Sequence, residues 1–299
     1  MDINLIGVPL YYGCDKKGVQ EGPRVLRENG IAEILRTEEN KVYDLGDIYI
    51  DNSIEKEAFC AGVNAKYINE IVSINNNLAH KVYSALSAGG FPLVIGGDHA
   101  LAAGSISGVA KYFKDDLAVI WVDAHGDMNT FETSPSGNVH GMPLSALFGV
   151  GDKSLTDIYF KGVKVKKENV FIIGARDLDS GEVDLINELD LKVWTMDRIK
   201  EVGIGSVCVE LYKCLENRGI KNIHLSFDID SIDPLLMKGT GTPVPNGINM
   251  DEAKTILNRI FETRLVKSMD FVEFNPMLDK SGLTTKMCIE LMETLKTLI

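Results

Sequence analysis

Three short segments of this chain gather histidine and aspartate side chains in a spacing that suits a pair of metal ions. They are Gly-Gly-Asp-His at 96–99, Asp-Ala-His-Gly-Asp at 123–127 and Ser-Phe-Asp-Ile-Asp at 226–230. Each follows an apolar run that is typical of a buried strand, and residues two apart on an extended strand point the same way. If the extended conformation persists, the side chains converge. The expected ligands are His99, Asp123, His125, Asp127, Asp228 and Asp230.

A simpler interpretation exists for each aspartate taken singly, because an Asp at a strand end is usually a helix N-cap or a turn residue. The combination has no such explanation, since apolar strand ends do not accumulate unpaired carboxylates. Four carboxylates share a small volume only when cations offset their repulsion. The pattern therefore predicts two divalent ions.

The ligand types indicate which metal and which chemistry to expect. A carboxylate-rich set without thiolates favours manganese, magnesium or iron over zinc, and the imidazoles argue against a purely magnesium-like oxygen cage. We expect Mn²⁺, two per subunit, with cobalt, nickel and iron as open alternatives. Two such ions lower the pKa of a shared water, so the expected reaction is a hydrolysis. Gly96 and Gly97 lack the spacing of a phosphate-binding loop.

The elements that would position these residues are visible as apolar runs rich in Val, Ile and Leu. They lie at residues 4–9, 41–47, 91–96, 117–123, 169–176, 191–197, 222–230 and 266–275. Such near-continuous runs are typical of parallel strands buried on both faces. Helical periodicity occupies residues 23–36, 58–86, 100–113, 205–217, 250–263 and 284–298. The alternation predicts one α/β domain over residues 1–299, with the site at the carboxyl ends of the strands.

Composition narrows the class of protein. The net charge is −12 and no basic cluster occurs, which argues against nucleic-acid or anionic-membrane binding. The five cysteines form no CxxC pair, and the N-terminus lacks the features of a signal peptide. No apolar run approaches the length of a membrane span. We therefore expect a cytoplasmic protein that acts on a small molecule.

Four motifs resemble those of the ureohydrolase family, which includes the arginases and agmatinases. They are the segments at 96–99, 123–129, 226–234 and 270–276, the last reading Asp-Phe-Val-Glu-Phe-Asn-Pro. The resemblance covers nearly the whole chain. It implies a binuclear manganese centre in a three-layer αβα sandwich with an eight-stranded, mostly parallel sheet, which agrees with the eight apolar runs.

Within this family the chain is most similar to arginases of the bacterial type. Ser-Gly-Asn-Val-His-Gly at 136–141 resembles the arginase motif, which implies hydrolysis of L-arginine to L-ornithine and urea. Asn and Ser can donate to a carboxylate, whereas Asp accepts from an ammonium group. By resemblance, Asn129, Ser136 and Asn138 hold the α-carboxylate and Asp179 receives the α-amino group. The implied substrate-binding set is Asn129, Ser136, Asn138, Asp179, Glu182 and Thr242.

The resemblance also implies catalytic roles. A hydroxide bridging the two manganese ions would attack the guanidinium carbon, with Glu273 pairing to the guanidinium. Asp127 would accept the nucleophile's proton and pass it toward the leaving amine. His140 would exchange protons with solvent, a role that suits imidazole. Taken singly, Glu273 could equally be a cap and His140 a turn residue; only their joint placement favours catalysis.

Other residues are predicted to be structural. His80 and His224 fit no motif, and Trp121 precedes Asp123 on a strand, where packing is the expected role. We expect a homo-oligomer, either a trimer or a hexamer. Asp251 stands where related chains often carry Arg, and the chain shows no extended C-terminal tail, so the detailed interface stays open.

Two alternatives to arginase remain. Another ureohydrolase would act on agmatine, guanidinobutyrate or formiminoglutamate, as an agmatinase, guanidinobutyrase or formimidoylglutamase does. A catalytically silent relative would bind arginine or support an assembly, but it would be expected to lack a ligand or catalytic residue. All of those positions are filled here.

Overall fold

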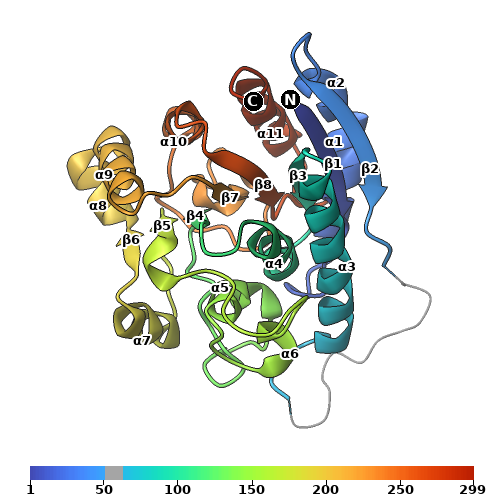
Figure 1. The fold of residues 1–299 in the computed structure, drawn as a ribbon. Helices are drawn as coiled ribbons and strands as arrows, with labels where there is room; N and C mark the ends of the chain where they lie inside the picture. Colours follow the sequence, from blue (N-terminus) through green and yellow to red (C-terminus); the bar gives the residue numbers. More distant parts are fainter. Residues whose placement is uncertain (51–62) are drawn as a thin grey trace.

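The computed structural model describes residues 1–50 and 63–299. Within them, one eight-stranded sheet has the order β2-β1-β3-β8-β7-β4-β5-β6 (Figure 1). Each described pairing is parallel. The strands are β1 (Asp2–Val8), β2 (Lys41–Asp47), β3 (Phe91–Gly96), β4 (Ala118–Val122), β5 (Val170–Ile173), β6 (Lys192–Trp194), β7 (Ile223–Asp228) and β8 (Val266–Val272). The predicted runs all become strands, and the sheet is parallel throughout rather than only mostly so.

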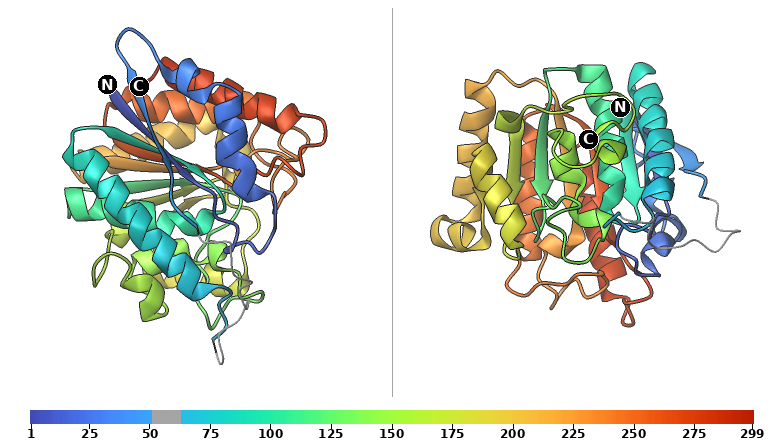
Figure 2. Two further views of the ribbon diagram at one scale, coloured as in Figure 1. Left: turned by 90° about the vertical axis from the view of Figure 1, so that its right-hand side faces the viewer. Right: turned by 90° about the horizontal axis from the view of Figure 1, so that it is seen from below.

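Helices cover both faces of the sheet, as the views in Figure 2 show. One apolar cluster joins the sheet to α1 (Gly22–Glu28), α2 (Ile31–Leu35), α8 (Met196–Val202), α9 (Ile204–Asn217), α10 (Met250–Glu262) and α11 (Leu283–Lys296). The second cluster joins it to α3 (Ile68–Ser87), α4 (Ala102–Phe113), α5 (Pro143–Leu147), α6 (Lys153–Thr156) and α7 (Ser180–Leu189). The predicted three-layer αβα architecture is therefore confirmed.

The helix boundaries differ from the prediction in two places. The stretch 23–36 is two helices, because Gly30 adopts a left-handed φ of 79° between α1 and α2. The predicted helix at 58–86 begins only at Ile68, and its first five positions, 58–62, lie outside the described residues. Helices α5 and α6 are too short to give a periodic signal, and α7 buries only Glu182 and Ile186, so its apolar stripe is weak.

The strand order places the motif segments side by side. Strands β3, β8, β7 and β4 are neighbours, and because they are parallel their carboxyl ends meet at one edge. The four motifs follow these four strands. The fold thus assembles segments that are up to 177 residues apart, from the start of the first at 96 to Glu273. No helix in the described part of the chain has the length and apolarity needed to cross a membrane.

Candidate metal centre and substrate pocket

The six predicted ligands do converge, but by turns rather than by continued extended strands. Strand β4 ends at Val122, and Asp123 Oδ1 accepts a hydrogen bond of 2.8 Å from the His125 amide. Asp127 has a left-handed φ of 51°. Asp228 Oδ1 likewise accepts from the Asp230 amide at 2.7 Å as the chain enters a 3-10 turn. The expectation of an extended alternation was therefore wrong, although its consequence holds.

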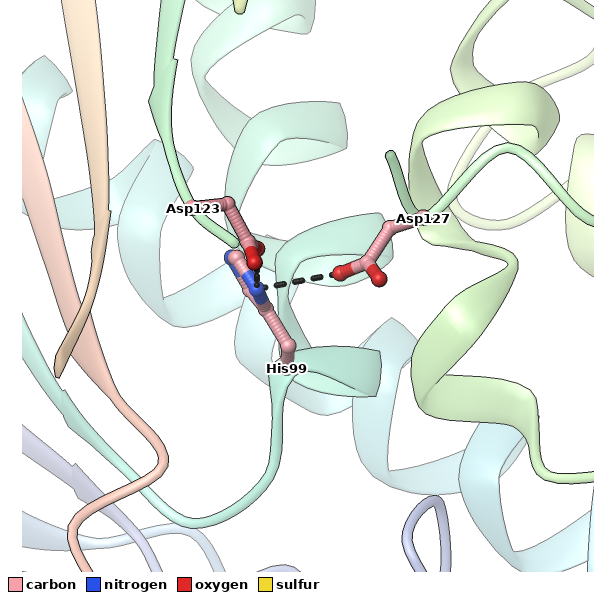
Figure 3. Close-up of side chains that lie close together, drawn as sticks. All are labelled: His99, Asp123 and Asp127. Atoms are coloured by element: carbon pink, nitrogen blue, oxygen red, sulfur yellow. Dashed lines mark ion pairs between the residues drawn. The ribbon is translucent and has the colours of Figure 1, made fainter. Parts of the chain in front are cut away.

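His99 lies at the centre of one ligand group. Its Nδ1 is 3.0 Å from Asp123 Oδ2, 3.1 Å from Asp127 Oδ2 and 3.2 Å from Asp228 Oδ2. Figure 3 shows the imidazole between Asp123 and Asp127, with all three side chains pointing toward one another. All four residues are buried. Such a geometry suits an ion between the imidazole and the carboxylates.

His125 forms a second group that adjoins the first. Its Nδ1 is 3.3 Å from Asp123 Oδ1 and 3.2 Å from Asp230 Oδ2. Asp123 therefore contributes one oxygen to each group. In each of the sets His99–Asp123–Asp127 and Asp123–His125–Asp230, the ligand atoms lie within 4.8 Å of one another. A shared carboxylate between adjoining groups is the arrangement that a binuclear centre requires.

One buried nitrogen, His99 Nδ1, indicates whether a metal ion fits between the imidazole and the carboxylates. His99 Nε2 lies 2.8 Å from Ser226 Oγ, which leaves Nδ1 to face the carboxylates. Among the described residues, Nδ1 has no partner with hydrogen-bond geometry despite the three short contacts. A buried nitrogen aimed between carboxylates, without a hydrogen bond, fits a ligand to a divalent ion.

The pKa shifts express the crowding of carboxylates. Burial, reinforced by Asp123, raises the pKa of Asp127 to about 6. Burial and then Asp230 raise the pKa of Asp228 well above its usual range. Burial acts in the same sense on Asp123, but His125 and His99 more than offset it and hold its pKa low. Without cations the cluster retains protons, and divalent ions would take their place.

A cavity of about 100 Å³ opens beside the ligand groups. Its lining is polar and includes each residue of the predicted substrate-binding set. The lining residues are His125, Asp127, Asn129, Ser134, Ser136, Asn138, His140, Gly141, Asp179, Glu182, Asp228, Asp230 and Thr242. Ser134 was not anticipated, because serines in loops are common and nothing in its spacing set it apart.

One wall of this pocket is held by the start of α7. Asp179 caps the helix, and its amide donates to Glu182 Oε2 at 2.9 Å. Asn129 Nδ2 donates to Asp179 Oδ2 at 2.8 Å, and Glu182 Oε1 accepts from the Met128 amide at 3.0 Å. Burial raises the pKa of Glu182 to about 7. Asp179 and Glu182 therefore act first as helix-capping groups, and Asp179 remains exposed to the pocket.

Another wall is the loop that contains Ser136 and Asn138, and its hydrogen bonds are longer than those around Asp179. Ser136 Oγ accepts from the Asn138 amide at 3.2 Å, and Asn138 Nδ2 donates to the carbonyl of Cys14 at 3.3 Å. Asn138 Oδ1 is buried and has no partner among the described residues. Thr242 Oγ1 donates to Asp230 at 2.9 Å. The pocket is thus directly linked to the candidate metal centre.

Glu273 is almost completely buried and contacts the pocket lining through His140. It is 1% exposed, has a left-handed φ of 66°, and accepts from the His99 amide at 2.9 Å. Its Oε1 lies 3.0 Å from His140 Nδ1. Burial alone would lower the pKa of His140, but the pairing with Glu273 raises it to about 9. Glu273 Oε2 has no partner in the described part of the chain.

Two residues beside the site were missed or misjudged from the sequence. Trp121 was expected only to pack, yet its indole stacks on His99 and donates to Asp123. Arg176 donates to the carbonyls of five residues that surround the end of β5 and the loop before α10: Gly174, Asp230, Ser231, Val244 and Pro245. A single aromatic or basic residue carries no spacing signal, so neither role could be found by motif.

The chain resembles known proteins over its full described length. A sequence model of the Arginase family matches residues 1–296. An arginase of Brevibacillus brevis is 42% identical over 293 residues, which cover 98% of this chain and 97% of that protein. An arginase structure from Bacillus cereus is 41% identical, with a TM-score of 0.92 and coverage of 99% and 98%. One from Bacillus caldovelox is 40% identical, with a TM-score of 0.93 and coverage of 98% and 97%. Motifs, fold, paired ligand groups and these similarities agree, and the chain belongs to the Arginase family.

Proposed function

We propose that this chain is an arginase, which hydrolyses L-arginine to L-ornithine and urea. The observation that carries the proposal is the pair of ligand groups sharing Asp123, beside a pocket lined by amide, hydroxyl and carboxylate groups. The sequence identity of about 40% to several bacterial arginases supports the same reaction.

We propose two Mn²⁺ ions per subunit as the cofactor. One would be held by His99, Asp123, Asp127 and Asp228, and the other would be held by Asp123, His125 and Asp230. The carboxylate-rich, thiolate-free donor set supports manganese, while cobalt, nickel and iron accept the same ligand types. When bound, the two ions supply an activated water and charge stabilisation for the hydrolysis.

The protein's own residues would orient the substrate and move its protons. Asp127 would accept a proton from the nucleophile and pass it to the leaving amine, and its position in the pocket lining supports this role. His140 has a side chain 17% exposed, so it can exchange protons between the pocket and solvent. Glu273 orients His140, and its second carboxylate oxygen supports the proposed pairing with the guanidinium.

The far end of the substrate would be recognised by the two pocket walls. We propose that Asn129, Ser136 and Asn138 hold the α-carboxylate and that Asp179 receives the α-ammonium, with Glu182 and Thr242 completing the site. The supporting observation is that all of these residues line one cavity. Agmatine lacks the carboxylate, so an enzyme for agmatine has no use for these donors.

Urea release by the manganese-loaded protein tests the proposal, with L-arginine and agmatine compared side by side and a chelated sample as control. We expect arginine turnover that chelation abolishes. Turnover of agmatine alone would keep the metal centre but overturn the substrate assignment. Urea from neither substrate would contradict the arginase proposal, and formiminoglutamate and guanidinobutyrate would then be assayed.

A substitution separates arginine from agmatine more finely. Asn138→Ala should raise KM for arginine much more than it changes any residual turnover of agmatine, because only arginine has the carboxylate. Ser134→Ala, at a pocket position with no proposed substrate contact, is the matched control. An equal response of both substrates to Asn138→Ala would overturn the assignment of the carboxylate site.

We also propose that residues 1–299 form a single domain, that the protein is cytoplasmic and that it assembles as a trimer or a hexamer. The continuous sheet with a helical layer on each face supports the single domain. Asp251 is exposed on α10, where a subunit contact could use it. Sedimentation velocity distinguishes monomer, trimer and hexamer, and a monomer at micromolar concentration would overturn the assembly proposal.

A further inference from the structure

Trp121 is a large aromatic side chain that touches two of the proposed metal ligands directly. It lies on β4, two residues before Asp123, and is fully buried. Its ring stacks on the imidazole of His99, with centroids 4.0 Å apart and planes 10° from parallel. Its Nε1 donates a hydrogen bond of 2.9 Å to Asp123 Oδ2. It is not part of the pocket lining.

The two contacts act on one of the two ligand groups. Asp123 Oδ2, which accepts from the indole, is the oxygen that lies 3.0 Å from His99 Nδ1. The other oxygen, Oδ1, faces His125. A hydrogen bond to a ligating carboxylate fixes its orientation and changes the electron density it offers, and such partners commonly alter metal affinity by about 10- to 100-fold.

We propose that Trp121 is a positioning residue for the metal centre that acts selectively on the ion of the His99 group. The stacked indole holds the plane of the His99 imidazole, and the Nε1 hydrogen bond holds Asp123 Oδ2, the oxygen that faces His99. The other oxygen, Oδ1, is held separately by the amide of His125. Trp121 therefore makes the two ion sites unequal. This inference rests on the proposed metal centre.

The sequence offers a direct optical readout, because it contains two tryptophans. The second, Trp194, lies on the edge strand β6, packs in the other apolar cluster and donates to Glu210. Trp194→Phe leaves Trp121 as the sole tryptophan, and Trp121→Phe leaves Trp194. We expect Mn²⁺ or Co²⁺ added to the metal-free protein to quench the emission of Trp121 strongly and that of Trp194 little.

Metal affinity tests the positioning role itself. Trp121→Phe keeps an aromatic ring over His99 but removes the Nε1–H. We expect it to lower the affinity for one of the two Mn²⁺ ions by about 10- to 100-fold and to leave the affinity for the other nearly unchanged. Calorimetric titration of the metal-free protein measures both affinities. Trp194→Phe is the matched control and should retain both affinities. Excess Mn²⁺ should restore most of the urea release of Trp121→Phe.

The outcomes separate this inference from the proposed function. Two ions bound as tightly by Trp121→Phe as by the unchanged protein would overturn the positioning role while leaving arginase activity in place. Equal weakening of both ions would overturn the selectivity. If Trp121→Phe folds poorly, the quenching of Trp121 in the Trp194→Phe protein still decides: no quenching by bound Mn²⁺ would contradict the inference. Failure of the unchanged protein to bind metal would instead overturn the proposed centre.

Discussion

Two buried histidine–aspartate clusters lie on neighbouring strands, and only one of them needs a metal. In the second cluster, His224 on β7 places Nε2 3.1 Å from Asp270 Oδ2 on β8 and Nδ1 2.8 Å from Ser268 Oγ. Ser105 on α4 also donates to Asp270 Oδ2. His224, Ser268 and Asp270 are almost completely buried, like five of the six proposed metal ligands; His125 is partly exposed.

The difference lies in the balance of donors and acceptors. His224 and Asp270 form one imidazole–carboxylate pair, and two hydroxyls contact the pair, while Asp270 Oδ1 has no partner among the described residues. In the proposed metal centre, two imidazoles face four carboxylates. Both clusters combine imidazoles with buried carboxylates, although His125 is partly exposed. The larger excess of carboxylates over internal donors therefore distinguishes the proposed cation site from the His224–Asp270 network.

The largest expected effect comes from removing a carboxylate of the proposed centre. Asp230→Ala should lose the ion of the His125 group and reduce urea release to background, because Asp230 completes that group and the reaction is proposed to need both ions. Metal content by atomic spectroscopy and urea assay check this together. Full activity with this position emptied would refute the binuclear interpretation.

The corresponding change in the His224–Asp270 network should affect stability instead. Asp270→Ala leaves His224 buried without its carboxylate, and breaking a buried pair in this way lowers the free energy of unfolding by about 3–5 kcal/mol. Denaturant unfolding measures the loss. The folded variant should still bind two ions per subunit; a loss of metal with little loss of stability would show that the two clusters are not independent.

Much of the architecture could be predicted from the sequence, but the site's local geometry could not. Most strands appear in the sequence as continuous apolar runs because both faces of a parallel sheet are buried. The expectation of burial on both faces fails for the edge strands, since β2 buries none of its residues and β6 buries only Trp194. His99 and the aspartates were found through their spacing. The turns that bring them together were not, since nothing in the sequence at Asp127 signals a left-handed backbone. His224 was expected to be structural, and its partners Ser268 and Asp270 could not be foreseen because they lie more than forty residues away in sequence.

A smaller effect is expected from removing the metal itself. Divalent ions should stabilise the fold by about 2.7 kcal/mol when their free concentration is one hundred times the dissociation constant. Thermal unfolding with Mn²⁺ and with a chelator measures this difference. Asp270→Ala should show the same metal-dependent increment as the unchanged protein, whereas Asp230→Ala should show much less. An increment that Asp230→Ala retains in full would contradict the comparison.

The smallest effect is expected from removing a hydroxyl of the His224–Asp270 network. Ser268→Ala removes one hydrogen bond to His224 and should lower the free energy of unfolding by about 1 kcal/mol. Metal content and urea release should stay unchanged. Denaturant unfolding beside the metal assay is sufficient, and a fall in metal binding here would mean that this network also supports the centre.

The backbone at two proposed catalytic carboxylates has a consequence for directed selection. Asp127 and Glu273 both adopt positive φ, at 51° and 66°, where a side chain other than glycine costs about 1–3 kcal/mol. A library screened for heat resistance without divalent ions would favour glycine at Asp127, because relief of the backbone cost is then not offset by a lost metal ligand. Such variants would be more stable but would no longer release urea. Any selection for a more stable form of this protein must therefore measure turnover in every round.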